Sequence, residues 1–180
     1  MSPAPYPVTR SKTSSDFCFV TDSGVTYNVY FDTNTPILPN DDLDRYSIFM
    51  GFSCIPPNGN GFDARVEPTI ILIIANMLKS NKKYIITYFC SSQNKQERGR
   101  AILFERWYKR SPLTEKIAHK QKRNANNYFG ALYCKKHREI ESIEATFVEF
   151  DLIKKYPDEI DASEELGSRV EENYDDFIYS

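Results

Sequence analysis

Alternating apolar and polar residues predict three β-strands in the first third of the chain. Two runs rich in aromatic and branched residues, 17–21 and 25–31, are separated by Asp22-Ser23-Gly24, a turn with glycine where a positive φ is favoured. A third run, 46–54, alternates in the same way and is stopped by Pro56-Pro57. We therefore expect a hairpin followed by a third strand.

The rest of the pattern predicts helices and strands in turn. The segment from about 63 to 79 is apolar all round in its middle, and its length favours a buried helix over a strand. Residues 111–127 are expected to form a long polar connection. Apolar spacing predicts the other elements as a strand over 84–90, a helix over 95–109, a strand over 128–134 and a helix from 140 to 150. The predicted order is β-β-β-α-β-α-β-α, an α+β fold with helices packed on a mixed, mostly antiparallel sheet.

The length of 180 residues predicts one domain, which we place at 16–155. Residues 1–15, with three prolines among the first seven, are expected to be a flexible arm, and 156–180 an acidic extension. The start lacks a basic and apolar leader, and the longest apolar run, 70–75, is far below the roughly 18 residues of a spanning helix. We expect a cytoplasmic protein without a membrane partner.

The cysteines and histidines do not have the spacing of metal ligands. The four cysteines form no Cys-x-x-Cys pair, and each is interpreted as a small buried hydrophobic residue in a strand. The two histidines, His119 and His137, stand beside lysine or arginine, and we expect both on the solvated surface. No metal site is predicted.

The charge is distributed unevenly along the chain, although the net charge is only −2. Counted by segment, residues 1–93 carry −1, residues 94–139 carry +9 and residues 140–180 carry −10. The basic segment could bind phosphate groups, or the acidic end could cover it within one chain or in a dimer. If it binds a nucleic acid or a protein partner, the expected contacts are Arg98, Arg106, Lys109, Lys120 and Arg123.

Three stretches of the chain, 63–70, 84–90 and 96–108, resemble a bacterial domain family that has no assigned function. The likeness covers roughly residues 16–155. The layout of the same region is also similar to the Gcn5-related N-acetyltransferase (GNAT) fold. In that family a strand leads into a glycine-rich loop at the start of a helix, whose backbone N–H groups bind the pyrophosphate of acetyl-coenzyme A, and a second strand and helix follow.

The GNAT resemblance implies a cofactor and a set of site residues. It implies that acetyl-coenzyme A binds at the loop Asn58-Gly59-Asn60-Gly61, with Arg65 as the nearby cation. The family's second helix commonly carries an asparagine and a tyrosine that protonates the leaving thiolate, and here Glu97 and Phe104 occupy those positions. A phenyl ring cannot donate a proton, so the resemblance leaves Tyr108, one turn on, as the candidate acid.

Two classes of function follow from the sequence. The first is an acetyltransferase-like domain that either binds an acyl-coenzyme A through residues 58–65 or retains only the scaffold. The alternative is a non-catalytic bacterial binding module, which uses the basic face over 94–139 to bind a nucleic acid or a protein partner, as in a small defence or toxin–antitoxin system.

Overall fold

The computed structural model describes residues 3–12, 16–35, 38, 41–56, 63–90, 97–124 and 127–149. Seven strands form one sheet in this part of the chain: β1 (Thr9–Arg10), β2 (Phe17–Val20), β3 (Thr26–Asp32), β4 (Ser47–Ile55), β5 (Ile85–Cys90), β6 (Ile117–Asn124) and β7 (Asn127–Cys134). The helices are α1 (Asp41–Asp44), α2 (Val66–Ser80), α3 (Glu97–Arg110) and α4 (Ile140–Glu149), with a 3₁₀ turn, η1, at Pro112–Glu115. None of the helices in the described ranges is long and apolar enough to cross a membrane.

The sheet has the strand order β1-β2-β3-β4-β5-β7-β6. All neighbouring strands run antiparallel except β4 and β5, which are parallel and are connected through α2. The fold is therefore a mixed α+β fold with a mostly antiparallel sheet, as the sequence predicts.

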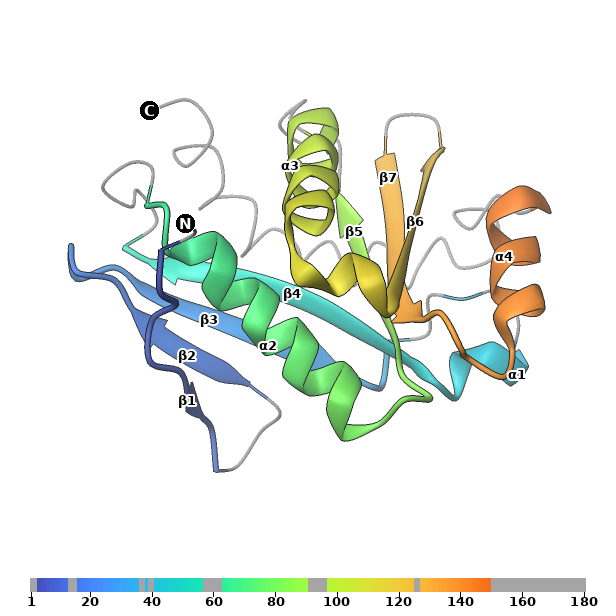
Figure 1. Ribbon diagram of the computed structural model, residues 1–180, viewed down its shortest axis with the longest axis horizontal. Helices are drawn as coiled ribbons and strands as arrows, with labels where there is room; N and C mark the ends of the chain where they lie inside the picture. The colour runs from blue at the N-terminus through green and yellow to red at the C-terminus, as the bar shows by residue number, and fades with distance from the viewer. Residues whose placement is uncertain are drawn as a thin grey trace.

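Helices cover the two faces of the sheet unequally (Figure 1). Helices α2 and α3 pack on one face, face A, where the larger hydrophobic core includes Ile70, Ile86 and Trp107. Helix α4 packs on the opposite face, face B, where Ile143 and Phe129 belong to a smaller core. Because side chains alternate along a strand, β4, β5 and β7 contribute to both cores.

The predicted hairpin and central elements are confirmed. Gly24 occupies the turn between β2 and β3 with a φ of 83°, a conformation that costs glycine little. Helix α2 starts at Val66, two residues before Pro68, and buries one side, which includes Ile70, Ile73 and Ile74, so the expected burial on all sides is wrong. Apolar residues also stand on its outer side, as Leu72 does at 39% exposure, which explains why periodicity alone could not separate helix from strand there.

Two regions differ from the expectation. The predicted polar connection contains a whole strand, β6, whose face-A side chains include His119 and Gln121. Polar side chains in these inward positions hide the apolar alternation by which a strand is recognised. The expected flexible arm also differs over its described part, because Tyr6 is buried at 4% exposure and β1 pairs with β2. The expected acidic extension, 156–180, lies outside the described residues.

Candidate functional site

The sheet divides where the parallel strands β4 and β5 separate. These strands pair at Ser47–Ile85, Ile48–Ile86 and Phe49–Thr87, and the ladder of paired residues ends there. Strand β4 continues to Ile55 against β3, while β5 continues to Cys90 against β7. The carboxyl-terminal halves of β4 and β5 therefore diverge, and Figure 1 shows the two strands running in different directions. We call this region the strand split.

Thr87 lies at the point where the strand split begins. Its hydroxyl donates to the carbonyl oxygen of Ile48 at 3.3 Å and lies 3.4 Å from the hydroxyl oxygen of Ser47. Both side chains are buried, and both project to face B. A buried hydroxyl bond of this kind ties β5 to β4 at the last paired position.

Four aromatic rings close the strand split on face A. The ring of Phe104, from α3, stacks on Tyr88 of β5 with 4.5 Å between centroids. It also contacts Phe52 of β4 at 5.9 Å and Trp107 at 5.7 Å. Phe104 therefore joins the two halves of the sheet at the position where the GNAT resemblance would place a catalytic tyrosine.

A buried polar network lies next to these rings, between α3 and β6. The hydroxyl of Tyr88 lies 2.7 Å from Nε2 of His119 and accepts a hydrogen bond from Nε2 of Gln121 at 3.0 Å. The same Gln121 nitrogen donates to the carbonyl oxygen of Ala101 at 3.2 Å, which fixes the orientation of the amide. The carboxylate of Glu105, 2.7 Å from Nδ1 of His119, favours the neutral imidazole with its hydrogen on Nδ1, so that Nε2 accepts from the Tyr88 hydroxyl.

Glu105 connects this network to the surface. Its Oε2 lies 2.7 Å from Nδ1 of His119, although the Nδ1–H bond is not aimed straight at that oxygen, so the contact is chiefly electrostatic. Its Oε1 is paired with Lys109 at 2.9 Å. Partial burial acts to raise the pKa of Glu105, but Lys109 and His119 outweigh it and the pKa is lowered. Burial raises the pKa of Tyr88 well above its ordinary value.

Burial also lowers the pKa of His119, and the carboxylate of Glu105 opposes this shift only in part. The folded protein therefore holds a neutral His119 at a pH where the unfolded chain, with an ordinary value near 6.5, already takes up a proton. We expect the free energy of unfolding to fall as the pH drops below about 6.5, with a slope of at most about 1.4 kcal/mol per pH unit for this one proton. Urea unfolding between about pH 7 and pH 5 measures the slope.

His119→Gln should flatten that slope, whatever it does to stability at pH 7. Glu105 does not obscure the result, because its ordinary pKa of 4.5 lies below the window in which the unfolded histidine titrates. Equal slopes for the wild type and His119→Gln would contradict the assignment.

Neither histidine lies on the solvated surface, so that expectation was wrong. The side chain of His119 is 1% exposed, and His137 is 4% exposed. His137 donates from Nε2 to the carbonyl oxygen of Lys83 at 2.9 Å and accepts the Glu139 N–H on Nδ1 at 3.1 Å. Lys120, the cation next to His119, projects to the opposite face of the sheet, where it pairs with Glu144, because adjacent residues of a strand alternate in direction.

The candidate acid Tyr108 is held away from the strand split. Its hydroxyl donates to the carbonyl oxygen of Ile117, in β6, at 2.9 Å. Its ring lies 5.0 Å from that of His119, and burial raises its pKa. Tyr108 thus connects α3 to β6, which is a structural role.

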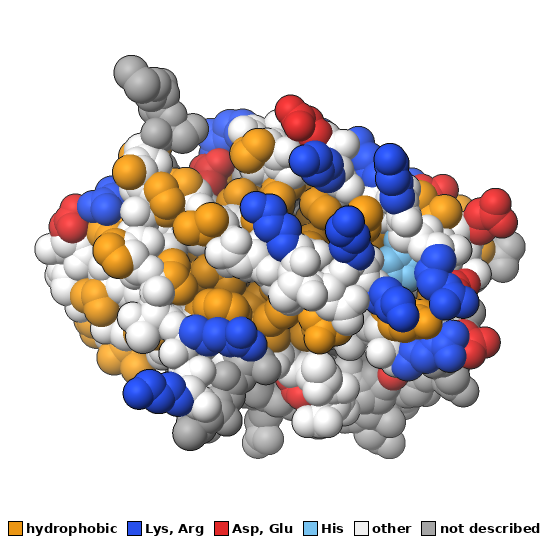
Figure 2. All heavy atoms as spheres, turned by 60° about the horizontal axis from the view of Figure 1, so that its bottom comes forward, with side chains coloured by type: hydrophobic (Ala, Val, Ile, Leu, Met, Phe, Trp, Pro, Cys, Tyr) orange, Lys and Arg blue, Asp and Glu red, His pale blue; other side chains and the backbone are white. Residues whose placement is uncertain are grey.

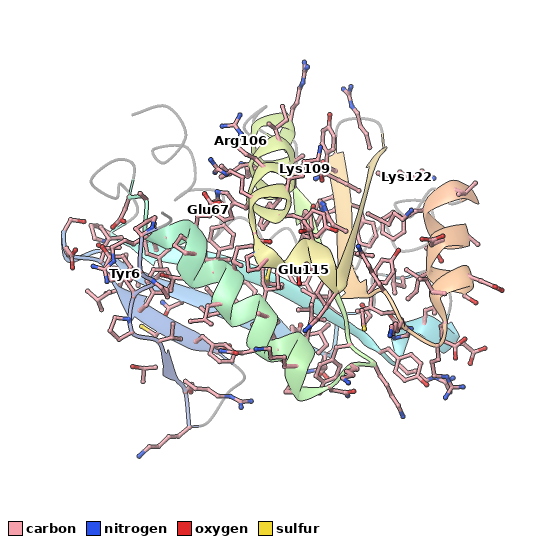
Figure 3. The ribbon with its side chains drawn as sticks, in the orientation of Figure 1. Tyr6, Glu67, Arg106, Lys109, Glu115 and Lys122 are labelled. Atoms are coloured by element: carbon pink, nitrogen blue, oxygen red, sulfur yellow. The ribbon has the colours of Figure 1, made fainter. Side chains whose placement is uncertain are left out.

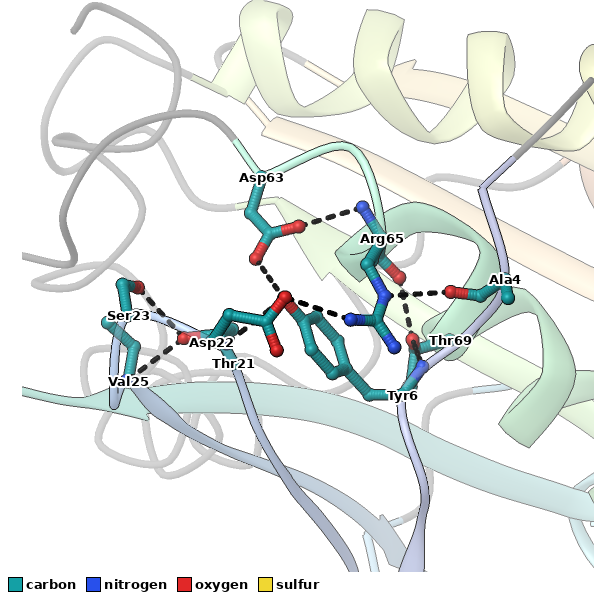
Figure 4. A network of polar contacts seen from close by, with 9 residues as sticks. All are labelled: Ala4, Tyr6, Thr21, Asp22, Ser23, Val25, Asp63, Arg65 and Thr69. Carbon is teal, nitrogen blue, oxygen red and sulfur yellow. Dashed lines mark hydrogen bonds and ion pairs between the residues drawn. The ribbon is translucent and has the colours of Figure 1, made fainter.

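The predicted pyrophosphate loop, Asn58 to Gly61, lies outside the described residues. Arg65, directly before α2, has partners within the protein instead (Figure 4). Its Nε donates to the carbonyl oxygen of Ala4 at 2.9 Å, and its guanidinium pairs with Asp22 at 2.9 Å and lies 3.8 Å from the ring centroid of Tyr6. Arg65 therefore fixes the amino-terminal arm to the β2–β3 turn.

Tyr6 is the centre of this network. Its backbone N–H donates to Thr69 at 2.9 Å, and its hydroxyl donates to Asp63 at 2.7 Å while accepting the Asp22 N–H at 3.1 Å. The ring of Tyr6 also stacks on Phe19 at 5.9 Å. Residues from the arm, the turn and the start of α2 are thereby brought together, a juxtaposition that sequence reasoning missed because an isolated tyrosine among prolines carries no periodic signal.

The three predicted basic contacts in α3 lie on its exposed side. Arg98, Arg106 and Lys109 are exposed, and Figure 3 shows Arg106 and Lys109 projecting from this helix. Lys109 is already paired with Glu105.

The two predicted contacts in β6 do not share one face with each other. Lys120 pairs with Glu144 of α4 at 3.4 Å, which places it on face B. Arg123, three positions farther along the strand, projects to the opposite face, face A. Its guanidinium lies 5.8 Å from the ring centroid of Tyr128 there. The structure therefore does not gather all five cations into a single basic face, and the nucleic-acid or protein-binding alternative stays a prediction.

Over the described residues, no group of three or more histidine, cysteine or acidic side chains is placed to hold a metal ion. The candidate site therefore consists of the strand split and the side chains around it. No family model, curated protein or solved structure matches this chain.

Proposed function

We propose that this protein is an acetyltransferase-like scaffold that binds acyl-coenzyme A in the strand split. The observation that supports this proposal is the divergence of β4 and β5 beyond Phe49 and Thr87. In open sheets with parallel strands, ligands bind in crevices at the carboxyl ends of those strands. Both strands lead from the strand split toward a helix, β4 to α2 and β5 to α3, which is the layout that the GNAT resemblance implies.

The diverging edges of β4 and β5 would pair with an extended arm that carries amide groups. The pantetheine arm of coenzyme A is such a chain, and an extended chain with amides can add to a strand edge through backbone hydrogen bonds. On face A the aromatic side chains of Phe52, Tyr88 and Phe104 close the split. The arm would therefore be bordered by apolar rings on one side, which favours a buried thioester over an exposed one.

The start of α2 would face the pyrophosphate end of the coenzyme. A helix amino terminus favours anions, but Asp63 and Glu67 lie there and would oppose one. Both carboxylates have partners: Asp63 accepts from Tyr6 and from the Arg65 N–H, and Glu67 pairs with Arg110 at 2.6 Å. This pairing offsets part of their repulsion for phosphate.

The proposal is for coenzyme binding and not for rapid acyl transfer. Phe104 cannot donate a proton, and the hydroxyls of Tyr88 and Tyr108 are directed to His119 and to the Ile117 carbonyl. Among the described residues near the split, neither tyrosine therefore offers its proton to a leaving thiolate. A bound acyl-coenzyme A would be held without the acid that the family commonly uses.

Isothermal titration calorimetry with acetyl-coenzyme A and coenzyme A tests this proposal. We expect saturable binding at one site, with a dissociation constant below about 1 mM, in the range common for enzyme ligands. Ser53→Trp places a large ring on β4 beside the split and should weaken binding at least about tenfold, because it occupies space that the arm needs.

The matched control is Asn28→Trp. Asn28 is the cross-strand partner of Ser53, lies on the same face and is also half-buried, but it is one strand farther from the split. Asn28→Trp should leave the affinity unchanged. No heat of binding at about 1 mM coenzyme, or an equal loss in both variants, would refute the proposal.

A further inference from the structure

A hollow lies on the outer side of α2. It is an open groove of about 510 Å³ between the amino-terminal arm, α2 and the end of α3 with η1. Its apolar wall includes Pro3 and Pro5 from the arm, Pro68 and Leu72 from α2, and Leu113 from η1. Leu72 is 39% exposed, although α2 buries most of its other apolar side chains. An apolar surface of this kind on a helix commonly marks a binding site.

The arm that forms one wall of the groove is fixed in place. Tyr6 is bonded to Thr69 and Asp63, and Arg65 is bonded to the carbonyl oxygen of Ala4, directly between the two groove-lining prolines. These contacts hold the arm against the first turns of α2 (Figure 4). The groove is therefore already formed, so its occupant would not have to order the arm on binding.

The rim of the groove carries a net positive charge from one lysine, because its arginine is paired with a glutamate. Lys79 is exposed at the end of α2, and Arg110 is 57% exposed at the end of α3. The acidic rim residue, Glu67, is paired with Arg110 at 2.6 Å. Figure 2 shows the same combination more widely, with hydrophobic side chains exposed between lysines and arginines. Such a groove fits a partner that combines an apolar stripe with acidic residues.

The chain itself contains a segment with this chemistry. In residues 164–178 an apolar residue recurs every four positions, at Leu166, Val170, Tyr174 and Ile178, and six acidic residues lie between or beside them. Residues 156–180 carry nine acidic residues against a single arginine, Arg169. A helix with this spacing would have one apolar side and one acidic side.

We propose that the groove binds residues 164–178 of the same chain as an amphipathic helix, with its apolar side against α2 and the arm. Recognition of a helix in a groove uses anchors at intervals of three and four residues, which this segment has. Helix α4 ends at Glu149, and the 15 residues up to 164 can span about 50 Å when extended. A domain of about 150 residues has a radius of gyration of about 15 Å, so the segment can reach the groove.

Limited trypsin digestion of the full chain tests the proposal, because Arg169 is the one lysine or arginine in 156–180. The measured quantity is the initial rate at which the fragment 170–180 is released, followed by mass spectrometry. Leu72→Asp puts a charge on the apolar wall and should raise this rate at least about tenfold, since cleavage needs the segment to leave the groove. Tyr174→Asp, on the segment side, should have the same effect.

The control is Ile102→Asp on α3, which is equally apolar, 47% exposed and not part of the groove lining. It should release the fragment at the wild-type rate. Circular dichroism checks that the variants stay folded. The proposal is wrong if the wild type releases the fragment as fast as Leu72→Asp, or if Ile102→Asp accelerates release equally. It is also wrong if protection of Arg169 increases with protein concentration, because a second copy is then the occupant.

Discussion

Phe104→Ala is expected to lower the free energy of unfolding by about 3–5 kcal/mol, the range measured when a buried aromatic ring is removed from a core. The ring is 9% exposed and contacts Phe52 of β4 and Tyr88 of β5, so its loss opens a cavity between the two halves of the sheet. We expect the coenzyme affinity to fall as well, because the apolar border of the strand split would be gone. Urea unfolding at pH 7 measures the first effect and calorimetry the second.

Ile102→Ala is the matched control for this substitution. Ile102 lies two residues earlier in α3 and is 47% exposed, so its removal should cost less than about 0.5 kcal/mol. Phe104→Leu, which keeps most of the volume, should fall between the two. Similar losses for Phe104→Ala and Ile102→Ala would show that the ring does not join the halves of the sheet.

Gly130→Ala should cost about 3 kcal/mol, at the upper end of ordinary overpacking. A Cβ at Gly130 would lie far inside van der Waals contact with Cζ of Tyr88, whose ring crosses over this glycine to reach β6. The ring has no easy way to move, because it is stacked on Phe104 and bonded to His119 and Gln121. Thermal or urea unfolding measures the loss.

Gly51→Ala makes a useful comparison, because the added Cβ would also overlap a tyrosine ring. That ring belongs to Tyr30, which is only half-buried and can move toward solvent, so we expect a smaller loss than at position 130. A double-mutant cycle adds a second test: in a Tyr88→Leu background, Gly130→Ala should lose most of its cost. A full cost in that background would mean that the penalty comes from the backbone and not from the ring.

The elements that the sequence predicted are those whose apolar residues follow a simple pattern. Burial alternates along β3 in the hairpin around Gly24, while β4 and β5 are buried at nearly every position and show as apolar runs. Helix α2 was predicted from its length, because apolar residues such as Leu72 also stand on its exposed side and hide the helical period. The parallel pairing of β4 with β5 and the position of β7 between β5 and β6 depend on contacts between distant residues, which a pattern along one chain does not contain.

The parts that were missed are polar or irregular. Strand β6 alternates, but its inward residues include His119 and Gln121, whose burial depends on partners in α3 and β5. The polar network at the site could not be predicted for the same reason, since Tyr88 and His119 are 31 positions apart in the sequence. The ordered position of the arm was missed because one residue, Tyr6, fixes it by stacking on Phe19 and bonding to Thr69. A single buried residue produces no periodic pattern in the sequence.

The position of β6 has a further consequence for solubility. Strands β1 and β6 form the two edges of the described sheet, and an exposed edge can add a strand from another molecule and so begin aggregation. Strand β1 has only two residues, which leaves little to pair with, while β6 is eight residues long and carries Lys120, Lys122 and Arg123 toward its free end. Charged side chains on a long edge discourage such pairing. Part of the basic charge thus acts against edge-to-edge pairing, a use that requires no ligand.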